Sequence, residues 1–388
     1  MSAVAEQTAR DLLTAAEAEF SARRFSDAIG KFNAVARMRN AHESTAVWYV
    51  TRCYLSLGRL EKAGEALHRL EALEPNKGRV LATRAAYHLA MEELDRAEAY
   101  AKKALETDPS RTYPLYILAA AHFKSGKLQK SLDYLSIVPL TQEDDFGNLK
   151  LGIETLRYNI LDTLKRRRDA NHSLLILLRI SPNNLEFLRA KANSLLRDGY
   201  PDEAIATVER MHEIAPQDES TLETAVYAYR DAGKTEQAIE FAKQLAEAKP
   251  TEVGPLISLI KLYRLHGYSD KVFATLDRAE RLAPGDAGLQ AEHAYSLMIV
   301  PERLNFQKAR TIAEKLPVEG PNAEWYRIVL GMALLATGEE AEGWKYIDDV
   351  ASSPDTPRES RTLAVTLQRH RRIQSILNKQ MSFEQLRE

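Results

Sequence analysis

The feature that most constrains this chain is a helical segment whose pattern returns along the sequence. Residues 78–111 read GRVLATRAAYHLAMEELDRAEAYAKKALETDPSR and predict two helices, Arg79–Met91 and Leu94–Glu106. Shifting the segment back by its own length places the small residue Ala97 of the second helix on Ala63. A short amphipathic helix cannot bury its apolar face alone, so a repeated pair of helices predicts an array of stacked hairpins.

One small or aliphatic residue in each second helix marks the register of the repeat. These anchors are Ala28, Ala63, Ala97, Ser131, Ala170, Ala204, Ala238, Val272, Ala309 and Gly343. Their sequence numbers rise by 35, 34, 34, 39, 34, 34, 34, 37 and 34, which predicts ten repeats. A proline follows most anchors by twelve residues, and proline ends a helix because its nitrogen carries no hydrogen. These prolines are Pro75, Pro109, Pro182, Pro216, Pro250, Pro284 and Pro321.

Two further positions agree with this register. An aromatic residue precedes the anchor by nine residues at Tyr54, Tyr229 and Tyr263. Glycine precedes it by five residues, where a tight turn needs a left-handed backbone, at Gly58, Gly126, Gly199, Gly233, Gly267 and Gly338. The period, the small anchors and these glycines resemble the tetratricopeptide repeat (TPR). The resemblance implies an all-α fold, a right-handed α-solenoid of about ten helical hairpins with a C-terminal capping helix.

Two breaks in the period predict the domain organisation. Pro139–Asn148, PLTQEDDFGN, is an acidic insertion that we interpret either as a hinge or as a longer rigid turn. It separates an N-terminal block of about four repeats, 1–138, from a C-terminal block of about six repeats, 149–355. Because exposed polar loops are preferred sites of cleavage, we expect proteases to cut this insertion early. Val300–Asn305 lengthens the turn of the ninth repeat by three residues.

Residues 356–388 are predicted to form a capping helix and tail. Thr356 and Pro357 make a favourable helix start, with an N-cap hydroxyl followed by proline at the first helical position. The helix is expected to reach about Lys379 and to cover the open apolar face of the last repeat. Its apolar stripe is Leu363, Leu367, His370, Ile373 and Leu377. The basic residues of this helix, which fall largely outside the stripe, are Arg369, Arg371 and Arg372. They give the helix a possible second role, which is contact with an acidic partner or with lipid headgroups.

Composition and missing motifs narrow the function. Lys and Arg number 53 against 55 Asp and Glu, a net charge of −2, and a dedicated nucleic-acid binder usually carries a basic excess. No GxxxxGK[ST], GxGxxG, GxSxG or HExxH motif occurs, so we expect neither an enzyme nor a cofactor. The single cysteine, Cys53, excludes an intramolecular disulfide and is predicted to be a buried thiol. With no visible secretory signal and no apolar run long enough for a bilayer, we expect a cytoplasmic protein.

Two histidines and two clusters have alternative interpretations. His88 and His122 occupy the same position of successive repeats, but no carboxylate occupies that position in the adjoining repeats, so we expect packed histidines and no metal. Arg166–Arg168 is either a small anion contact or a solvated turn whose charge Asp169 offsets. Leu174–Leu178 is apolar on every face and must be buried all round. Either the acidic insertion or another chain covers it, so a homo-oligomer through Leu174–Leu178 is possible.

The resemblance also implies a concave groove lined by the first helices of successive repeats. Its apolar and aromatic end is lined by Leu13, Phe20, Trp48, Leu55, Tyr113, Tyr116 and Phe123. Its polar and cationic end is lined by Asn159, Arg189, Asn193, Arg197, Tyr227, Arg230, Lys261 and Arg264. Arg189 and Asn193 resemble the basic–Asn pair of TPRs that hold chaperone tails by a carboxylate clamp. Thr224, Gly254 and Ser258 replace the next clamp residues, so the resemblance to a chaperone-tail adaptor fails there.

We therefore expect a non-catalytic scaffold or adaptor that binds a protein or peptide in its groove. An acidic segment of the partner would lie on the cationic end, unless Glu186, Glu223 and Asp231 neutralise these cations within the protein. An accessory or regulatory subunit of an enzyme complex, for example in envelope polysaccharide assembly or secretion, is the alternative. An RNA-binding helical repeat agrees less well with the near-neutral charge.

Overall fold

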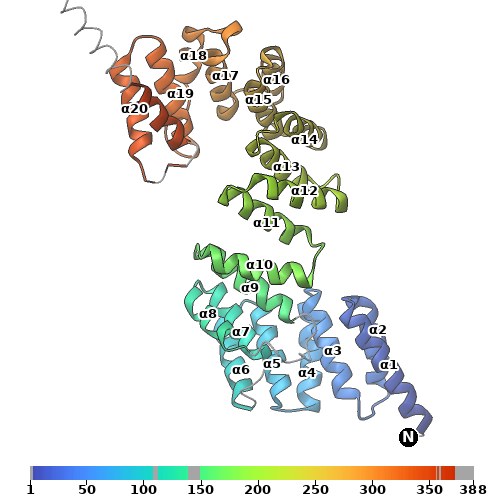
Figure 1. The fold of residues 1–388 in the computed structure, drawn as a ribbon. Helices are drawn as coiled ribbons and strands as arrows, with labels where there is room; N and C mark the ends of the chain where they lie inside the picture. The colour runs from blue at the N-terminus through green and yellow to red at the C-terminus, as the bar shows by residue number, and fades with distance from the viewer. Residues whose placement is uncertain (1–2, 108–111, 139–148, 355, 358–359, 372–388) are drawn as a thin grey trace, which may run out of the picture. The chain divides into compact units, whose positions relative to one another are not determined.

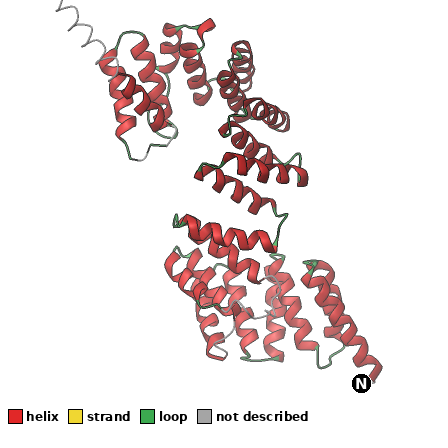
Figure 2. Ribbon diagram, in the orientation of Figure 1, coloured by secondary structure: helices red, strands yellow, loops and turns green. Residues whose placement is uncertain are grey.

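The computed structural model describes residues 3–107, 112–138, 149–354, 356–357 and 360–371. In these ranges all regular structure is helical and no strand occurs (Figures 1 and 2). The chain divides into two compact units, an N-terminal unit, Met1–Phe187, and a C-terminal unit, Leu188–Glu388. No helix within the described ranges combines the length and the apolar character that crossing a membrane requires.

The N-terminal unit consists of five helical hairpins. Its helices are α1 (Ala3–Ser21), α2 (Phe25–Arg37), α3 (Glu43–Ser56), α4 (Leu60–Leu73), α5 (Gly78–Ala90), α6 (Leu94–Thr107), α7 (Thr112–Lys124), α8 (Leu128–Ser136), α9 (Leu149–Thr163) and α10 (Arg167–Ile180). Helices α5 and α6 are the two helices predicted for residues 78–111, each within one residue at either end. This confirms the helical hairpin as the unit of the fold.

The C-terminal unit adds five more hairpins, and α11 begins just before its boundary. Its helices are α11 (Leu185–Asp198), α12 (Pro201–Ile214), α13 (Glu219–Asp231), α14 (Thr235–Ala248), α15 (Gly254–His266), α16 (Ser269–Leu282), α17 (Ala287–Ile299), η1 (Pro301–Arg303), α18 (Phe306–Ala313), α19 (Ala323–Ala336), α20 (Glu340–Ser352) and a helix over 360–371. The described residues thus form ten hairpins, and the predicted all-α solenoid of about ten repeats is confirmed.

The anchors lie where the two helices of a hairpin approach each other most closely. All ten of them are buried. In the last hairpin a Cβ atom on Gly343 would lie only 2.7 Å from the carbonyl oxygen of Gly331. A small residue is therefore required at the crossing, because any larger side chain would separate the two backbones.

In nine of the ten hairpins the turn uses a left-handed residue five positions before the anchor, the exception being Leu304 in the ninth, with φ of −57°. The six predicted glycines all have positive φ, between 67° at Gly58 and 95° at Gly338. Arg23, Glu92 and Lys165 occupy the same position in three other repeats with φ of 60°, 61° and 58°. The turn geometry is thus kept even where the sequence does not supply glycine, at a conformational cost.

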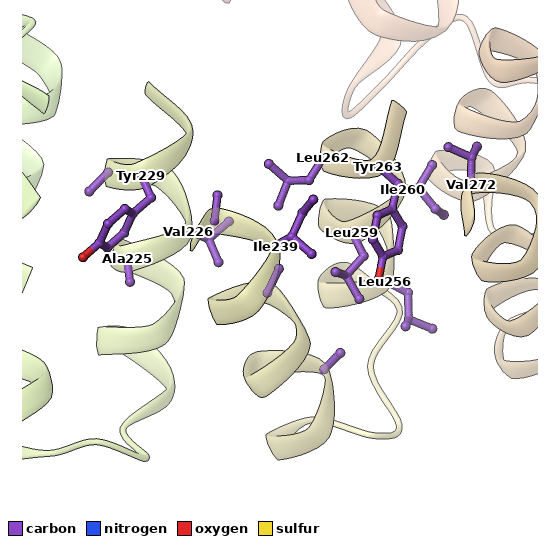
Figure 3. Packing of buried hydrophobic residues seen from close by; sticks show 14 of the residues in the cluster. Ala225, Val226, Tyr229, Ile239, Leu256, Leu259, Ile260, Leu262, Tyr263 and Val272 are labelled. Carbon is purple, nitrogen blue, oxygen red and sulfur yellow. The ribbon is translucent and has the colours of Figure 1, made fainter. Parts of the chain in front are cut away.

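Within each unit, clusters of buried apolar side chains extend from one hairpin to the next. Figure 3 shows this in the C-terminal unit, where Ala225, Val226 and Tyr229 of α13 pack with Ile239 of α14 and Leu256 of α15. The predicted interhelical tyrosines Tyr229 and Tyr263 are both buried in this cluster. Because every hairpin is covered by its neighbours, stability depends on interfaces between repeats rather than on one central core.

The two breaks in the period have different outcomes. Pro139–Asn148 lies outside the described residues, so its interpretation as a hinge or rigid turn stays a prediction. The extra residues of Val300–Asn305 form the short 3₁₀ turn η1. Helix α18 then starts after Asn305, whose side-chain oxygen accepts a hydrogen bond from the backbone N–H of Lys308 at 2.9 Å.

The helix over 360–371 packs on the last hairpin, as expected of a cap. Ala364 is fully buried and contacts a cluster that contains Ile328, Ile347 and Val350, with Leu363 and Leu367 beside it. The Thr356 hydroxyl donates to the carbonyl oxygen of Val350 at 3.0 Å. Its predicted role as N-cap depends on backbone amides in 358–359, which lie outside the described residues. Arg372, Ile373 and Leu377 lie outside the described residues.

Three smaller predictions concern single side chains. Cys53 is buried as predicted, and burial raises the pKa of its thiol to about 12. His88 and His122 stack on Tyr100 and Tyr134, with ring centroids 5.2 and 5.4 Å apart. The two histidines therefore have the same packing role in successive repeats. Across the described residues, no group of three or more His, Cys, Asp or Glu side chains is arranged to hold a metal ion.

Helix α10 leaves the predicted covering of Leu174–Leu178 as a prediction. Leu174 and Leu177 are buried, but Leu175 has 54% of its surface exposed, so the helix is not covered on every side by the described residues. Its position relative to the acidic insertion lies outside the described residues. The basic turn before it is partly neutralised, since Arg166 donates to the Asp169 carboxylate at 2.7 Å.

Candidate partner-binding grooves

A groove of about 500 Å³ opens on the N-terminal unit between α1, α3, α7 and α9. We call it the N-terminal groove. It is lined by Phe20, Ser21, Arg23, Phe25, Arg52, Leu55, Ser56, Tyr113, Tyr116, Leu149, Leu151, Gly152, Thr155, Leu156 and Asn159. These helices are the first helices of their repeats, so this is the surface on which the sequence placed a groove. It brings together the predicted residues Phe20, Leu55, Tyr113, Tyr116 and Asn159.

Two tyrosines from α7 form the aromatic part of this groove. The rings of Tyr113 and Tyr116 stack with centroids 6.4 Å apart. Burial raises the pKa of Tyr113 to about 12 and also raises the pKa of Tyr116, so both phenols stay protonated at neutral pH. Gly152 of α9 leaves room for Tyr116, because a Cβ there would lie 3.3 Å from the phenol oxygen. The groove therefore offers the faces of aromatic rings, while the phenol groups pack towards the protein.

A buried arginine supports the aromatic wall. The guanidinium of Arg52 lies 4.6 Å from the ring centroids of both Phe20 and Trp48, a cation–π arrangement. Trp48 itself is buried, and its indole N–H donates to the Thr83 hydroxyl at 3.0 Å. Trp48 thus supports Arg52 from within the core and does not line the groove. Arg52 was not predicted from the sequence, although it follows Trp48 by one helical turn.

The N-terminal groove carries a positive charge. Among the described residues that line it are Arg23 and Arg52, and none of them is Asp or Glu. Asn159 stands exposed in its lining, although the sequence had placed it with the cationic half. Phe123 is partly buried in the neighbouring core cluster and does not line the groove.

A larger groove of about 930 Å³ lies on the C-terminal unit between α15, α17, α19 and the segment that leads into the capping helix. We call it the C-terminal groove. It is lined by Arg230, Ile257, Lys261, Leu262, Arg264, Leu265, Gly288, Glu292, Tyr295, Ile299, Asn322, Glu324, Trp325, Tyr326, Pro357, Ser360 and Leu363. Three of the predicted cations, Arg230, Lys261 and Arg264, meet here.

The C-terminal groove contains a buried carboxylate that the sequence analysis missed. Glu292 of α17 lies 2.8 Å from Nη2 of Arg264 and 3.4 Å from Nζ of Lys261. Arg264 also donates to the Ser296 hydroxyl at 3.1 Å, and its guanidinium lies 4.7 Å from the centroid of Tyr295. The sequence did contain an indication of this carboxylate. Tyr295 occupies in its repeat the position that Lys261 occupies in the preceding repeat, and Glu292 precedes Tyr295 by one helical turn, so Glu292 lies on the same helix face.

The remaining predicted residues lie on α11 and α13. Arg189 donates to the Ser220 hydroxyl at 3.3 Å, while Asn193 and Arg197 are exposed and line neither groove. Arg230 pairs with the Asp231 carboxylate at 2.8 Å, and its guanidinium lies 5.2 Å from the ring centroid of Tyr227. Carboxylates of the protein itself therefore neutralise part of this positive charge. Asp231 pairs with Arg230, and Glu292 pairs with Lys261 and Arg264.

Comparison with protein families agrees with this architecture. The family model described as "Tetratricopeptide repeat" matches residues 13–77 and 83–144. The later hairpins keep the buried anchors and, except in the ninth, the left-handed turns. The matched part of the chain is a set of tetratricopeptide repeats. Repeats of this family generally mediate protein–protein interaction and scaffolding, and their fold is generally non-catalytic.

Solved structures of low sequence identity are also similar to the chain. A chain of the Cut9–Hcn1 hetero-tetramer of the APC/C is 14% identical, with a TM-score of 0.47, over 74% of the present chain and 55% of that chain. Yeast Tom70 is 14% identical, with a TM-score of 0.47, over 97% of the present chain and 99% of the Tom70 chain. YrrB is described as a TPR protein with an unusual peptide-binding site. It is 20% identical, with a TM-score of 0.41, over 48% of the present chain and 93% of the YrrB chain. No curated protein sequence matches the chain.

Proposed function

We propose that this TPR protein is a non-catalytic scaffold or adaptor that binds an extended segment of a partner protein in its N-terminal groove. The observation that carries the proposal is the convergence of Tyr113, Tyr116 and Asn159 from α7 and α9 on one open groove. The cytoplasmic location expected from the sequence is part of the same proposal.

The chemistry of the groove suits an extended peptide. An apolar or aromatic side chain of the partner would pack on the faces of Tyr113 and Tyr116, where each Å² of apolar surface removed from water contributes about 25 cal/mol. The side-chain amide of Asn159 both donates and accepts hydrogen bonds and so matches a peptide group of the partner. Arg23 and Arg52 favour a segment that also carries a carboxylate.

The predicted cations of the C-terminal unit belong to this proposal as a binding surface for an acidic portion of the partner. Arg189 and Arg230 are two of these cations, and arginine can grip a carboxylate through two parallel hydrogen bonds. Replacing both by Glu is expected to weaken partner binding by at least about 2 kcal/mol, the lower range for truncating one side of a buried charge pair.

The test is a quantitative pull-down from the source cell with isotope-labelled extracts. Wild type is compared with Tyr116→Ala/Asn159→Ala, with Arg189→Glu/Arg230→Glu, and with Tyr200→Ala as a control outside both grooves. All variants must first keep the helical content and melting temperature of the wild type. Partners bound by the N-terminal groove are depleted about tenfold or more by the first variant and retained by the control.

Equal recovery by wild type and the folded Tyr116→Ala/Asn159→Ala variant contradicts the proposal for the N-terminal groove. The nature of the recovered species decides the alternatives. A large enzyme complex identifies an accessory subunit, and recovery that disappears after ribonuclease treatment identifies an RNA-binding role.

A further inference from the structure

A third cavity, of about 610 Å³, lies within the N-terminal unit between α8, α9 and α10. We call it the lateral pocket. Its lining includes Leu132 of α8, Glu154, Arg157 and Leu161 of α9, and Ser173 and Ile176 of α10. Helix α9 presents a different face to the N-terminal groove, and among the described residues none lines both cavities. The lateral pocket is therefore separate from the groove, and its volume is that of a small-molecule site.

Glu154 occupies a position that is aliphatic in most other repeats. It precedes the anchor Ala170 by sixteen residues. The residues with the same spacing in repeats one to four and six to eight are Leu12, Val47, Leu81, Leu115, Leu188, Leu222 and Leu256. The Glu154 side chain has only 1% of its surface exposed. Repeat five thus buries a carboxylate where the repeat normally places an apolar group, a costly exchange that the packing of the hairpin does not require.

The protein satisfies only one oxygen of this carboxylate. Nη1 of Arg157 donates to Oε1 of Glu154, while Nη2 of Arg157 donates to the carbonyl oxygen of Leu135 at 3.0 Å. In the part of the chain that the structure describes, no group donates to Oε2, although this atom is buried. A buried acceptor without a donor is unfavourable, so a donor from a ligand would stabilise it. Because Arg157 already balances the charge of Glu154, a neutral donor suits Oε2 better than a second cation.

Repeat five also lacks a pair of rings that other repeats have. In repeats three, four and seven, the residue nine before the anchor stacks on the residue three after it, with ring centroids 5.2–5.4 Å apart. These pairs are His88 with Tyr100, His122 with Tyr134, and Tyr229 with Phe241. The equivalent residues of repeat five are Leu161 and Ser173, and both line the lateral pocket. Ser173 therefore leaves the volume of an aromatic ring unfilled beside apolar side chains.

We propose that the lateral pocket binds a small aromatic molecule that carries a neutral O–H or N–H donor, as a phenol or an indole does. The ring occupies the space left by Ser173 and packs on Leu161 and Ile176. The donor forms a hydrogen bond with Oε2 of Glu154. Since Glu154 is almost fully buried, only a flat group that enters the pocket completely reaches its carboxylate. This site does not depend on the function proposed for the N-terminal groove.

The experiment measures the affinities of two matched probe pairs for the full-length chain by ligand-observed NMR titration. Indole is compared with 1-methylindole and phenol with anisole, because methylation removes the donor and keeps the ring. A general affinity for apolar surface would favour the methylated member of each pair. The comparison on the wild-type protein therefore tests the donor without any substitution.

Four variants then locate the site. Ser173→Tyr introduces the residue that repeats three and four carry, and so fills the pocket. Glu154→Leu restores the aliphatic residue of the other repeats and removes the acceptor. Thr275→Tyr is the matched control, because Thr275 has the position of Ser173 in repeat eight. Tyr116→Ala reports binding in the N-terminal groove.

We expect wild type to bind indole and phenol about tenfold more tightly than their methylated partners, the effect of one hydrogen bond to a charged group. Ser173→Tyr should lose binding of all four probes, and Glu154→Leu should bind both members of each pair equally well. Thr275→Tyr and Tyr116→Ala should behave like wild type.

The proposal is overturned if wild type binds neither indole nor phenol, or binds the methylated probes as tightly. It is also overturned if the preference for the donor persists in Glu154→Leu, a substitution that keeps an aliphatic residue at a position where the neighbouring repeats have one. Loss of binding in Tyr116→Ala would place the probes in the N-terminal groove and would equally overturn it.

Discussion

The carboxylate of Glu292 lies 2.8 Å from the guanidinium of Arg264, and both side chains are largely shielded from water. They come from α17 and α15, the first helices of neighbouring repeats. The pair therefore joins two hairpins by charge at a place where most other contacts between hairpins are apolar. Each buried charge depends on the other, because an unpaired charge in a low-dielectric environment is strongly unfavourable.

Replacing Glu292 by Ala is expected to destabilise the C-terminal unit by about 3 kcal/mol, since removing one partner of a buried ion pair leaves the other uncompensated. The measurement is urea denaturation followed by the fluorescence of Trp325 and Trp344. Lys261→Ala is the matched control. It should lower the free energy of unfolding by less than about 1 kcal/mol, because half-exposed ion pairs contribute little. Equal effects of the two substitutions would show that burial of Glu292 has no energetic importance.

Glu74 predicts a specific dependence of stability on pH. Burial acts to raise the pKa of this carboxyl, but hydrogen bonds from Arg79, Lys77 and Ser44 outweigh burial and lower the pKa to about 2. A group whose folded pKa lies below its unfolded value stabilises the protein above the unfolded pKa. This stabilisation is lost as pH falls from about 4.5 towards 2, and a shift of this size corresponds to at most about 3 kcal/mol.

The measurement is the difference in unfolding free energy between wild type and Glu74→Gln at several pH values. We expect a constant difference above about pH 5 that shrinks steadily at lower pH. Glu65→Gln serves as the control, because Glu65 is exposed on α4, the helix that ends at the C-cap Glu74, and should change stability by less than about 0.5 kcal/mol. A difference between wild type and Glu74→Gln that does not change with pH would remove Glu74 as the source of this dependence.

Two glycines of the N-terminal unit make a matched pair for testing the turns. Gly126 has φ of 74°, and a Cβ there would meet no atom within 4 Å, so Gly126→Ala should cost about 1 kcal/mol for conformation alone. Gly30 lies inside α2 in equally open space, where Gly30→Ala should stabilise the helix by about 0.5–1 kcal/mol. Thermal melts should show a lower melting temperature for Gly126→Ala and a higher one for Gly30→Ala. A higher melting temperature for Gly126→Ala would contradict the left-handed turn.

The sequence predicted positions that depend on the register of the repeat. Small anchors at the helix crossings and left-handed residues at the turns recur in most repeats at a fixed spacing, so both can be read without a structure. Glu92 shows the limit of this approach, since it adopts φ of 61° without being glycine. There the packing of the hairpin imposes the turn and overrides the preference of the residue.

The groove residues were less predictable, because exposure depends on side chains from neighbouring repeats. Trp48 has a groove position in the repeat register, yet Arg52 and Thr83 cover it in the folded unit. Glu292 was missed for the converse reason, since its two partners lie on a helix of the preceding repeat. Position within the repeat gives the direction of a side chain, and the neighbours determine whether it is accessible.

The capping helix gives the last prediction. Ala364 is fully buried against Ile347 and Val350, so Ala364→Asp would place a charge in an apolar contact and release the helix. We expect lower thermal stability, binding of the dye ANS and aggregation, because a repeat array needs a polar cover at its end. Truncation before Thr356 should have the same effects. Val365→Asp is the matched control, since Val365 is exposed on the same helix and its substitution should leave the protein monomeric. A truncated chain that stays monomeric and equally stable would mean that the last hairpin needs no cover.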